Sequence, residues 1–451
     1  MVDPSAALPD GVEPMIGPHL LRQRWYGGSD REAVPIEVVA TAELSARGGH
    51  RLLWAIVADG GGRYQLVLGE RRAGEHAEFL NGQDAAFVGA TAEHFYYDAM
   101  VDPELSIEIL GLVTGGREHA DRVRPITAEQ SNSSLVYDDR IILKLFRRLS
   151  GGANPDVEVT EALAAAGFAH VAAPVATWCR DDDVLAFAQR FLAGGSEGWA
   201  LALTSLRDLY AAGPDDPSEA GGDFSSEASR LGRATAEMHL ALASAFGVDR
   251  EVLRAGAWDE LVAEIESGLH RAAGAGWTGT PAHTIAALRA AADPGPAIRV
   301  HGDYHLGQVM RTDAGWFVLD FEGEPARPLH ERIAPTSPFK DVAAMLRSFQ
   351  YAAHFALLER GEESSGRLQR LADAWERRNR AAFLEGYLAT VGITALLPED
   401  GASRAAVSLA FELDKALYEL AYERAYRPEW VDIPSAAIRR LLARSESDGL
   451  G

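Results

Sequence analysis

A dense group of polar residues lies between positions 301 and 308, where the sequence is His-Gly-Asp-Tyr-His-Leu-Gly-Gln. Asp303 is followed five residues later by the amide Gln308, and Asp320 follows a short apolar run further on. Metal-dependent phosphoryl transfer needs a carboxylate at the attacking hydroxyl, oxygen ligands for Mg²⁺ and a cation at the phosphates. This order and spacing are typical of a catalytic loop. Asp303 is the predicted catalytic base, and Gln308 and Asp320 are predicted Mg²⁺ ligands.

Each residue taken alone has a simpler explanation. A His-Gly-Asp triplet is usually a turn, and an aspartate at the end of a strand is usually a solvated cap. The combination is more specific, because 320–325 adds Asp-Phe-Glu-Gly-Glu-Pro shortly after the 301–308 segment. The ordered set of Asp303, Gln308 and Asp320 therefore predicts phosphoryl transfer.

These segments resemble the catalytic and metal-binding motifs of aminoglycoside-phosphotransferase-like and choline-kinase-like enzymes, which share the protein-kinase fold. The sequence is still more similar to bacterial maltokinases, which make maltose 1-phosphate from maltose and ATP. The similar segments extend over nearly the whole chain and lie at 22–28, 129–134, 142–148, 154–158, 301–308, 320–325, 337–349 and 412–419. The resemblance implies an α+β, bilobal protein-kinase-like fold with a β-rich N-terminal lobe, an extra N-terminal cap and a mostly helical C-terminal lobe.

The hydrophobic pattern agrees with this layout. Short apolar runs between Gly-rich turns predict a small antiparallel sheet over about 35–90, and two apolar runs around Asp138-Asp139 predict a hairpin. Helical periodicity predicts helices over 226–245, 260–273, 342–358, 367–391 and 405–425. We therefore predict a cap subdomain at 1–90, an ATP-binding N-lobe at 91–198, and a C-lobe at 199–451 carrying the catalytic loop and the sugar-acceptor site.

The resemblance also assigns residues to ATP and Mg²⁺. It implies that Lys144 pairs the α- and β-phosphates and that Glu158 is its ion-pair partner, although Glu158 could simply favour a helix N-terminus. Glu322 stands where protein kinases have the glycine of Asp-Phe-Gly, and it is assigned to the metal or to the surface. The remaining predicted ATP contacts are Ser131, Asn132, Ser133 and Ser134, in a phosphate loop without glycines, and Gln189 and Phe191, in the link between lobes.

The sugar acceptor requires hydrogen-bonding side chains and an aromatic surface. Glu412, Lys415, Glu419 and Tyr422 recur at a spacing that places them on one face of a predicted helix. Such a face is often merely solvated, but the resemblance favours it as the acceptor pocket, together with His301 and Arg311. Asp341, near the start of another predicted helix, is interpreted as structural.

Composition limits the partners. The chain has 451 residues, with 43 Lys and Arg against 66 Asp and Glu, a net charge of −23 that argues against general binding to nucleic acid or anionic membranes. One cysteine, Cys179, excludes an intrachain disulfide, and no apolar run predicts a secretion signal or a membrane span. We expect a cytoplasmic protein. By pathway, trehalose synthase is the natural partner of a maltokinase, whose product would feed glycogen synthesis from trehalose.

Other functions stay open. A glucosamine or aminoglycoside kinase would use the same machinery, and acidic residues at 322, 324, 412 and 419 are compatible with an amino sugar. A non-catalytic nucleotide-binding scaffold is a second alternative, disfavoured because the catalytic set is complete. A metallohydrolase built on His301, Asp303 and His305 would leave Lys144 without a role.

Overall fold

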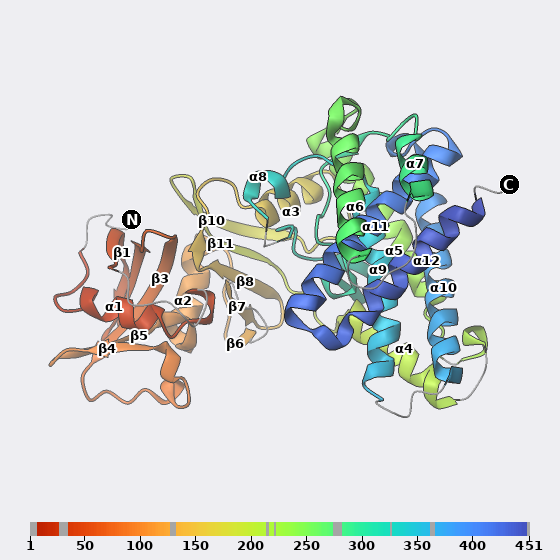
Figure 1. Cartoon of the computed structure of the whole chain (residues 1–451). Helices are drawn as coiled ribbons and strands as arrows, with labels where there is room; N and C mark the ends of the chain where they lie inside the picture. The colour runs from red at the N-terminus through yellow and green to blue at the C-terminus, as the bar shows by residue number, and fades with distance from the viewer. Residues whose placement is uncertain are drawn as a thin grey trace. The chain divides into compact units, whose positions relative to one another are not determined.

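The computed structural model describes residues 7–26, 35–126, 132–212, 216–220, 222–273, 282–324, 327–360 and 366–448. The chain forms two compact units, one of residues 1–158 and 172–193 and the other of residues 159–171 and 194–451. The first unit is rich in strands and the second is mainly helical (Figure 1). The predicted α+β class is therefore confirmed.

The first unit begins with helix α1 (Glu13–Leu20) and an antiparallel sheet. Its strands, in spatial order, are β1 (Glu37–Arg47), β2 (His50–Ala58), β3 (Arg63–Arg72), β5 (His94–Asp98) and β4 (Phe87–Ala90), and β9 (Arg148–Leu149) also pairs with β3. The predicted sheet is confirmed, but it continues past the predicted boundary at residue 90. It does so because β5 pairs with β3, starting from Leu68 opposite Asp98.

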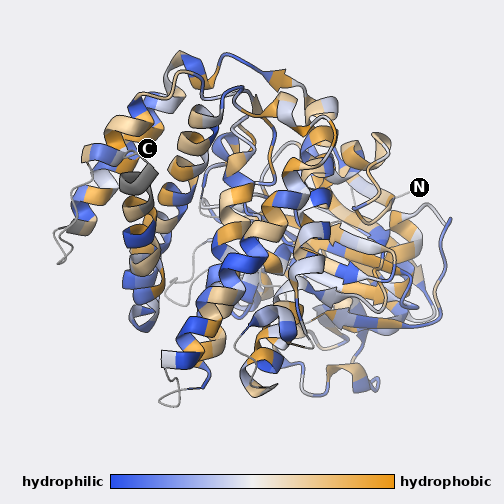
Figure 2. Ribbon diagram, turned by 90° about the vertical axis from the view of Figure 1, so that its right-hand side faces the viewer, coloured by the Kyte–Doolittle hydropathy of each residue, from blue (hydrophilic) through white to orange (hydrophobic). Residues whose placement is uncertain are grey.

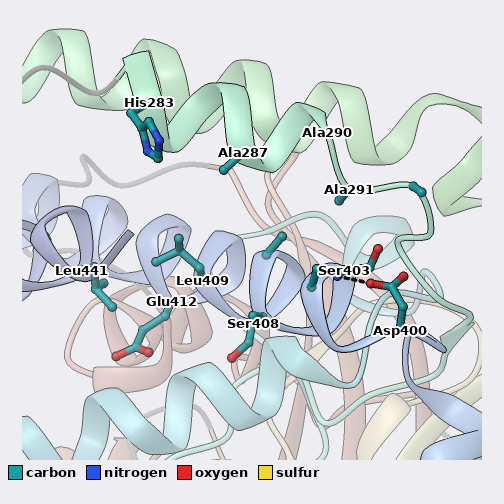
Figure 3. Close-up of a pocket in the computed structure, with 14 residues that line it drawn as sticks. His283, Ala287, Ala290, Ala291, Asp400, Ser403, Ser408, Leu409, Glu412 and Leu441 are labelled. Atoms are coloured by element: carbon teal, nitrogen blue, oxygen red, sulfur yellow. Dashed lines mark hydrogen bonds between the residues drawn. The ribbon is translucent and has the colours of Figure 1, made fainter. Parts of the chain in front are cut away.

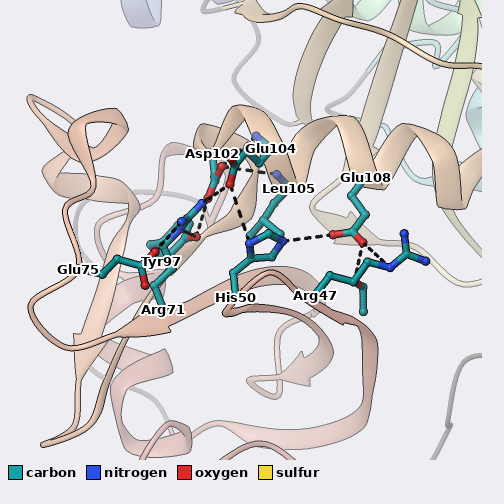
Figure 4. Close-up of polar contacts among 10 residues, drawn as sticks. Arg47, His50, Arg71, Glu75, Tyr97, Asp102, Glu104, Leu105 and Glu108 are labelled. Atoms are coloured by element: carbon teal, nitrogen blue, oxygen red, sulfur yellow. Dashed lines mark hydrogen bonds and ion pairs between the residues drawn. The ribbon is translucent and has the colours of Figure 1, made fainter.

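Helix α2 (Pro103–Val113) is fixed to this sheet by a polar cluster around Asp102, its N-cap (Figure 4). The Asp102 carboxylate accepts hydrogen bonds from the backbone N–H of Glu104 (2.9 Å), the Tyr97 hydroxyl (2.6 Å) and the Arg71 guanidinium (2.8 Å). The Asp102 side chain is only 1% exposed. One carboxylate therefore caps the helix and neutralises a partly buried arginine.

Replacement of Asp102 by alanine is expected to reduce the free energy of unfolding by about 3 kcal/mol or more. The change removes the N-cap of α2 and takes away the buried carboxylate that pairs with Arg71. Urea denaturation would measure the loss. The matched control is Glu104→Ala, because Glu104 also pairs with Arg71 but is largely exposed, and its loss should cost under about 1 kcal/mol. Equal losses in the two variants would contradict the assignment.

The second sheet of this unit contains the predicted hairpin. Its strands, in spatial order, are β10 (Pro174–Arg180), β11 (Asp183–Arg190), β8 (Ile141–Phe146), β7 (Asn132–Tyr137) and β6 (Val123–Ile126). The turn between β7 and β8 consists of Asp138 (φ 49°) and Asp139 (φ 52°), the left-handed pair required by a tight hairpin. Helix α3 (Pro155–Ala165) follows, and the Asn154 side chain caps it by accepting from the N–H of Asp156 (3.0 Å).

The second unit contains the other main helices. They are α4 (Gly198–Ala212), α5 (Ser225–Phe246), α6 (Trp258–Ala273), α7 (Ala282–Arg289), α8 (Leu329–Arg332), α9 (Phe339–Leu358), α10 (Gly366–Leu388), α11 (Gly401–Tyr426) and α12 (Asp432–Asp448). Its short strands are β12 (Ser196–Glu197), β15 (Val309–Thr312) and β16 (Gly315–Val318) in one sheet, and β13 (Val248–Asp249) and β14 (Ala297–Ile298) in another. The five predicted helices are confirmed as α5, α6, α9, α10 and α11.

Helices α5 and α10 approach each other closely because each has a glycine at the contact. A Cβ atom on Gly232 would collide with the carbonyl of Phe383, and one on Gly386 with the carbonyl of Ser229. Figure 2 shows hydrophilic and hydrophobic residues mixed along the long helices, as expected for helices that bury one face. Among the helices in the described part of the chain, none has the length and apolar character needed to cross a membrane.

Candidate active site

The loop that carries Asp303 is held from behind by Asp341, in the first turn of α9. The Asp341 carboxylate accepts hydrogen bonds from the backbone N–H of His301 (2.8 Å) and of Gly302 (2.9 Å). It also lies 3.1 Å from Nε2 of His239, whose Nδ1 lies 2.8 Å from the Tyr387 hydroxyl. Burial raises the pKa of Asp341, but the His239 hydrogen bond and the loop N–H groups outweigh it and lower the pKa. Asp341 is therefore an ionised residue that fixes the backbone of the catalytic loop, in agreement with its structural interpretation.

Asp303 is partly accessible, with 25% of its side chain exposed. Its Oδ2 lies 4.0 Å from Nε2 of His305, and the Nδ1 of His305 accepts from the N–H of Gly307 at 3.0 Å. Partial burial lowers the pKa of His305, although the charge of Asp303 opposes the shift. His305 is thus neutral at neutral pH.

His301 was predicted to contact the sugar, but the structure gives it a different place. Its side chain is buried, and its Nε2 donates to the carbonyl of Leu319 at 2.8 Å. Its Nδ1 accepts from the N–H of Asp303 at 3.3 Å, and its ring packs on Phe321 at 4.9 Å. Both ring nitrogens are used within the site itself, so this geometry indicates that His301 braces the loop and does not bind the acceptor.

The predicted metal ligands lie close together in this unit. Nε2 of Gln308 lies 3.5 Å from Oδ2 of Asp320, which follows β16 with a left-handed φ of 64°. Carboxylate oxygens of Asp320 and Glu322 lie within 4.8 Å of each other. Two carboxylates and an amide that can turn its oxygen inward form a hard-oxygen donor set. This donor set fits Mg²⁺, so these residues could hold the ion.

A cavity of about 680 Å³ in the helical unit brings Asp303 together with three of the predicted acceptor residues, Lys415, Glu419 and Tyr422. The other residues that line it are Trp199, His305, Gly307, Glu324, Ala344, Ser348, Tyr351, Tyr418, Glu423, Arg427 and Trp430. Apart from Tyr422, its aromatic residues were not predicted from the sequence. Tyr418 could have been predicted, because it lies on the same helix as Lys415 and Tyr422. Trp199 and Tyr351 lie on α4 and α9, and the sequence around them contains no pattern that indicates a sugar site.

Two predicted acceptor residues lie elsewhere. Glu412 is buried and forms a bidentate ion pair with Arg380 of α10 (2.7 and 2.9 Å). It lines a separate cavity of about 600 Å³ between α7, α11 and α12 (Figure 3). Arg311 of β15 pairs with Glu227 at 2.7 Å and does not line the acceptor cavity. Glu412 lies about 4.5 Å before Lys415 along the helix axis, where α10 packs, and there it pairs with Arg380 and does not line the cavity that contains Asp303.

Lys144 of β8 lies in the first unit with an acidic partner. The Nζ of Lys144 donates to Oδ2 of Asp156 at 2.9 Å, and both side chains are buried. The Asn154 cap starts α3 at a point that turns Asp156 toward β8. Glu158, the predicted partner, is exposed two residues further along α3, and its pairing with Lys144 stays a prediction.

The predicted phosphate loop is described only in part. Ser131 lies outside the described residues, and Asn132, Ser133 and Ser134 belong to strand β7. Ser134 is buried opposite Lys144 in the ladder, and Oγ of Ser133 accepts from Nε of Arg147 at 2.8 Å. Ser133 and Ser134 therefore have structural contacts.

The predicted adenine contacts lie at the end of β11. Gln189 pairs with Ile142 in the ladder. The N–H of Phe191 donates to the carbonyl of Arg140 at 2.9 Å, and its carbonyl accepts from the N–H of Ala193 at 3.1 Å. The Phe191 N–H is already used within the first unit, so the prediction that it binds adenine is not supported by this structure.

Comparison with known proteins identifies the family. Residues 122–383, more than half of the chain, match the phosphotransferase enzyme family, and residues 19–102 match the maltokinase N-terminal cap domain. The chain therefore belongs to the phosphotransferase enzyme family and carries a cap of the maltokinase type. The predicted family resemblance and protein-kinase-like fold are confirmed.

Two relatives are named glucosamine kinase. The protein from Streptacidiphilus jiangxiensis is 26% identical over 345 residues, which cover 72% of this chain and 74% of that protein. The protein from Mycolicibacterium smegmatis is 26% identical over 354 residues, covering 74% and 84%. A solved glucosamine kinase in complex with glucosamine, ADP and inorganic phosphate has a TM-score of 0.62 at 22% identity and covers 97% of this chain and 100% of its own. That likeness shows the fold, including the cap.

Proposed function

We propose that this protein transfers the terminal phosphoryl group of ATP to the anomeric hydroxyl of maltose, which gives maltose 1-phosphate and ADP. The observation that carries the proposal is the position of Asp303 on the wall of a cavity with aromatic and hydrogen-bonding side chains. The family and the maltokinase-type cap support it. A cavity of about 680 Å³ lies within the range that small-molecule sites occupy.

In this proposal each residue has a limited task. Oδ2 of Asp303 accepts the proton of the attacking hydroxyl, and the ammonium of Lys144 contacts the phosphates of ATP. Gln308 and Asp320, with Glu322 beside them, would hold Mg²⁺, and the ion would neutralise charge on the phosphates. His305, whose pKa is lowered by burial, lies next to Asp303, with its Nε2 4.0 Å from Oδ2 of the base.

The charges of the cavity favour a neutral sugar over an amino sugar. Except for Asp303, its carboxylates already have arginine partners at ion-pair distance. The pairs are Glu419 with Arg347 (2.6 Å), Glu423 with Arg427 (2.9 Å) and Glu324 with Arg327 (3.0 Å). Lys415 adds a further positive charge to the lining. An ammonium group entering here would meet neutralised acids and a cation, whereas sugar hydroxyls could still hydrogen-bond to the paired carboxylates.

Glucosamine is the second candidate acceptor, and the relatives favour it, because both curated proteins described above are named glucosamine kinase. Phosphorylation of glucosamine would use the same catalytic base and the same metal ligands as phosphorylation of maltose. The difference lies only in which acceptor the cavity binds.

An ADP-release assay with Mg-ATP and maltose, glucosamine, glucose or kanamycin tests the proposal. We expect turnover with maltose, and ³¹P–¹³C NMR should place the phosphate on the anomeric oxygen. Turnover of glucosamine alone would overturn the choice of maltose and keep the kinase. Nucleotide binding without turnover of any acceptor would favour the non-catalytic scaffold. Coupling to trehalose synthase and supply of glycogen synthesis remain predictions of the family resemblance.

A further inference from the structure

Three tyrosines on one side of α11 are unusual for this chain. All twelve of its tyrosines lie in the described residues, and only Tyr418, Tyr422 and Tyr426 are exposed, at 38%, 41% and 72%. Large aromatic side chains at the surface leave apolar area in water, so a contiguous group of them indicates a binding surface. We call these three residues the tyrosine ladder.

The ladder has a regular geometry. Its members are four residues apart, so they follow one side of the helix over a rise of about 12 Å. The rings of Tyr418 and Tyr422 are stacked with centroids 6.5 Å apart, and those of Tyr422 and Tyr426 are 4.8 Å apart. Each of the three side chains still keeps at least 38% of its surface exposed.

The ladder begins at the acceptor cavity and continues beyond it. Tyr418 and Tyr422 line the cavity, whereas Tyr426 does not. Tyr418, the first residue of the ladder, lines the same cavity as Asp303. A chain-like acceptor with one end at Asp303 could therefore follow the ladder outward.

The chemistry of the ladder fits a sugar chain. The C–H faces of a pyranose ring pack on aromatic rings, and the tyrosine hydroxyls can bond to sugar hydroxyls. Two cations already lie over the ladder. Nζ of Lys415 is 5.1 Å from the ring centroid of Tyr418, and Arg427, which pairs with Glu423, is 5.2 Å from that of Tyr422. A neutral polyol is thus favoured over a cationic ligand.

We propose that the tyrosine ladder forms sugar-binding subsites beyond the disaccharide, so that the protein binds linear α-1,4-linked glucose chains of three or more units. The inference rests on the proposed function for the position of the reducing end. It adds a ligand class, because a maltose molecule at Asp303 needs only the cavity whereas a longer chain reaches Tyr426.

Calorimetric titration with maltose, maltotriose and maltotetraose tests the ladder without requiring turnover. We expect maltotetraose to bind the wild type about tenfold more tightly than maltose, because burying roughly 50 Å² of ring surface changes affinity by about that factor. Tyr426→Ala should remove most of this gain and leave maltose binding unchanged. Tyr426→Phe keeps the ring and should retain the gain.

The remaining outcomes separate the ladder from the proposed function. Equal binding of maltotetraose by the wild type and Tyr426→Ala, or no gain with chain length, would overturn the ladder even if maltose is phosphorylated. Tighter maltotetraose binding that depends on Tyr426, in a protein that phosphorylates only glucosamine, would keep the ladder and overturn maltose as acceptor. Tyr422→Ala, inside the cavity, should weaken the binding of all three sugars.

Discussion

Replacement of Asp303 by asparagine is expected to lower kcat for the acceptor by at least ~10²-fold, because positioned general bases typically contribute that much or more. Asparagine keeps the shape of the side chain and cannot take a proton. Only a quarter of the Asp303 side chain is exposed, and its backbone N–H bonds to His301, so the loop should keep its conformation. The loss should therefore fall on kcat, with KM for ATP little changed.

Steady-state and single-turnover rates with Mg-ATP would measure this effect, and thermal unfolding would confirm that the variant is folded. The matched control is Asp313→Asn, because Asp313 is an exposed aspartate in the turn after β15. That variant should retain the wild-type rate. A fully active Asp303→Asn protein would contradict the assignment of the base.

The parts of the fold and site that the sequence predicts well are those set by local spacing. Two apolar runs around Asp138-Asp139 suffice to predict the hairpin, since the turn itself requires residues that tolerate positive φ. The order and spacing of Gln308 and Asp320 predict that they bind the same Mg²⁺. In the structure the hairpin of β15 and β16 between them brings the two side chains together.

The errors concern choices made by packing. Acidic residues at both 156 and 158 leave open from sequence which of the two side chains contacts Lys144. Residues two positions apart point to nearly opposite sides of a helix, so the start of α3 decides that Asp156 makes the contact. Glu412 shares a helix side with Lys415, yet the packing of Arg380 from α10 takes it into the core. The aromatic walls of the cavity come from separate helices, and no single segment of sequence contains that arrangement.

The brace behind the catalytic loop predicts the second large effect. Asp341→Ala removes one carboxylate that accepts from the N–H groups of His301 and Gly302 and lies against His239. Two loop N–H groups would then be left buried without this acceptor, in a site where Asp341 is fully buried. We expect a loss of about 3–5 kcal/mol in the free energy of unfolding. A loss of kcat should accompany it, since the loop that carries Asp303 is no longer fixed.

The pH dependence of that loss identifies the carboxylate as its source. The pKa of Asp341 is lower in the folded protein than in the unfolded chain, so the ionised group stabilises the fold above an unfolded pKa of about 3.9. This stabilisation disappears as the pH falls through the lower, folded pKa. The difference between wild type and Asp341→Ala in urea denaturation should thus be constant from about pH 5 to 8 and shrink below about pH 4. The control is Tyr387→Phe, which removes only the hydroxyl that contacts His239 and should lower the free energy of unfolding by about 1 kcal/mol. If Asp341→Ala lowered it by no more than this, the loop would be held by other contacts.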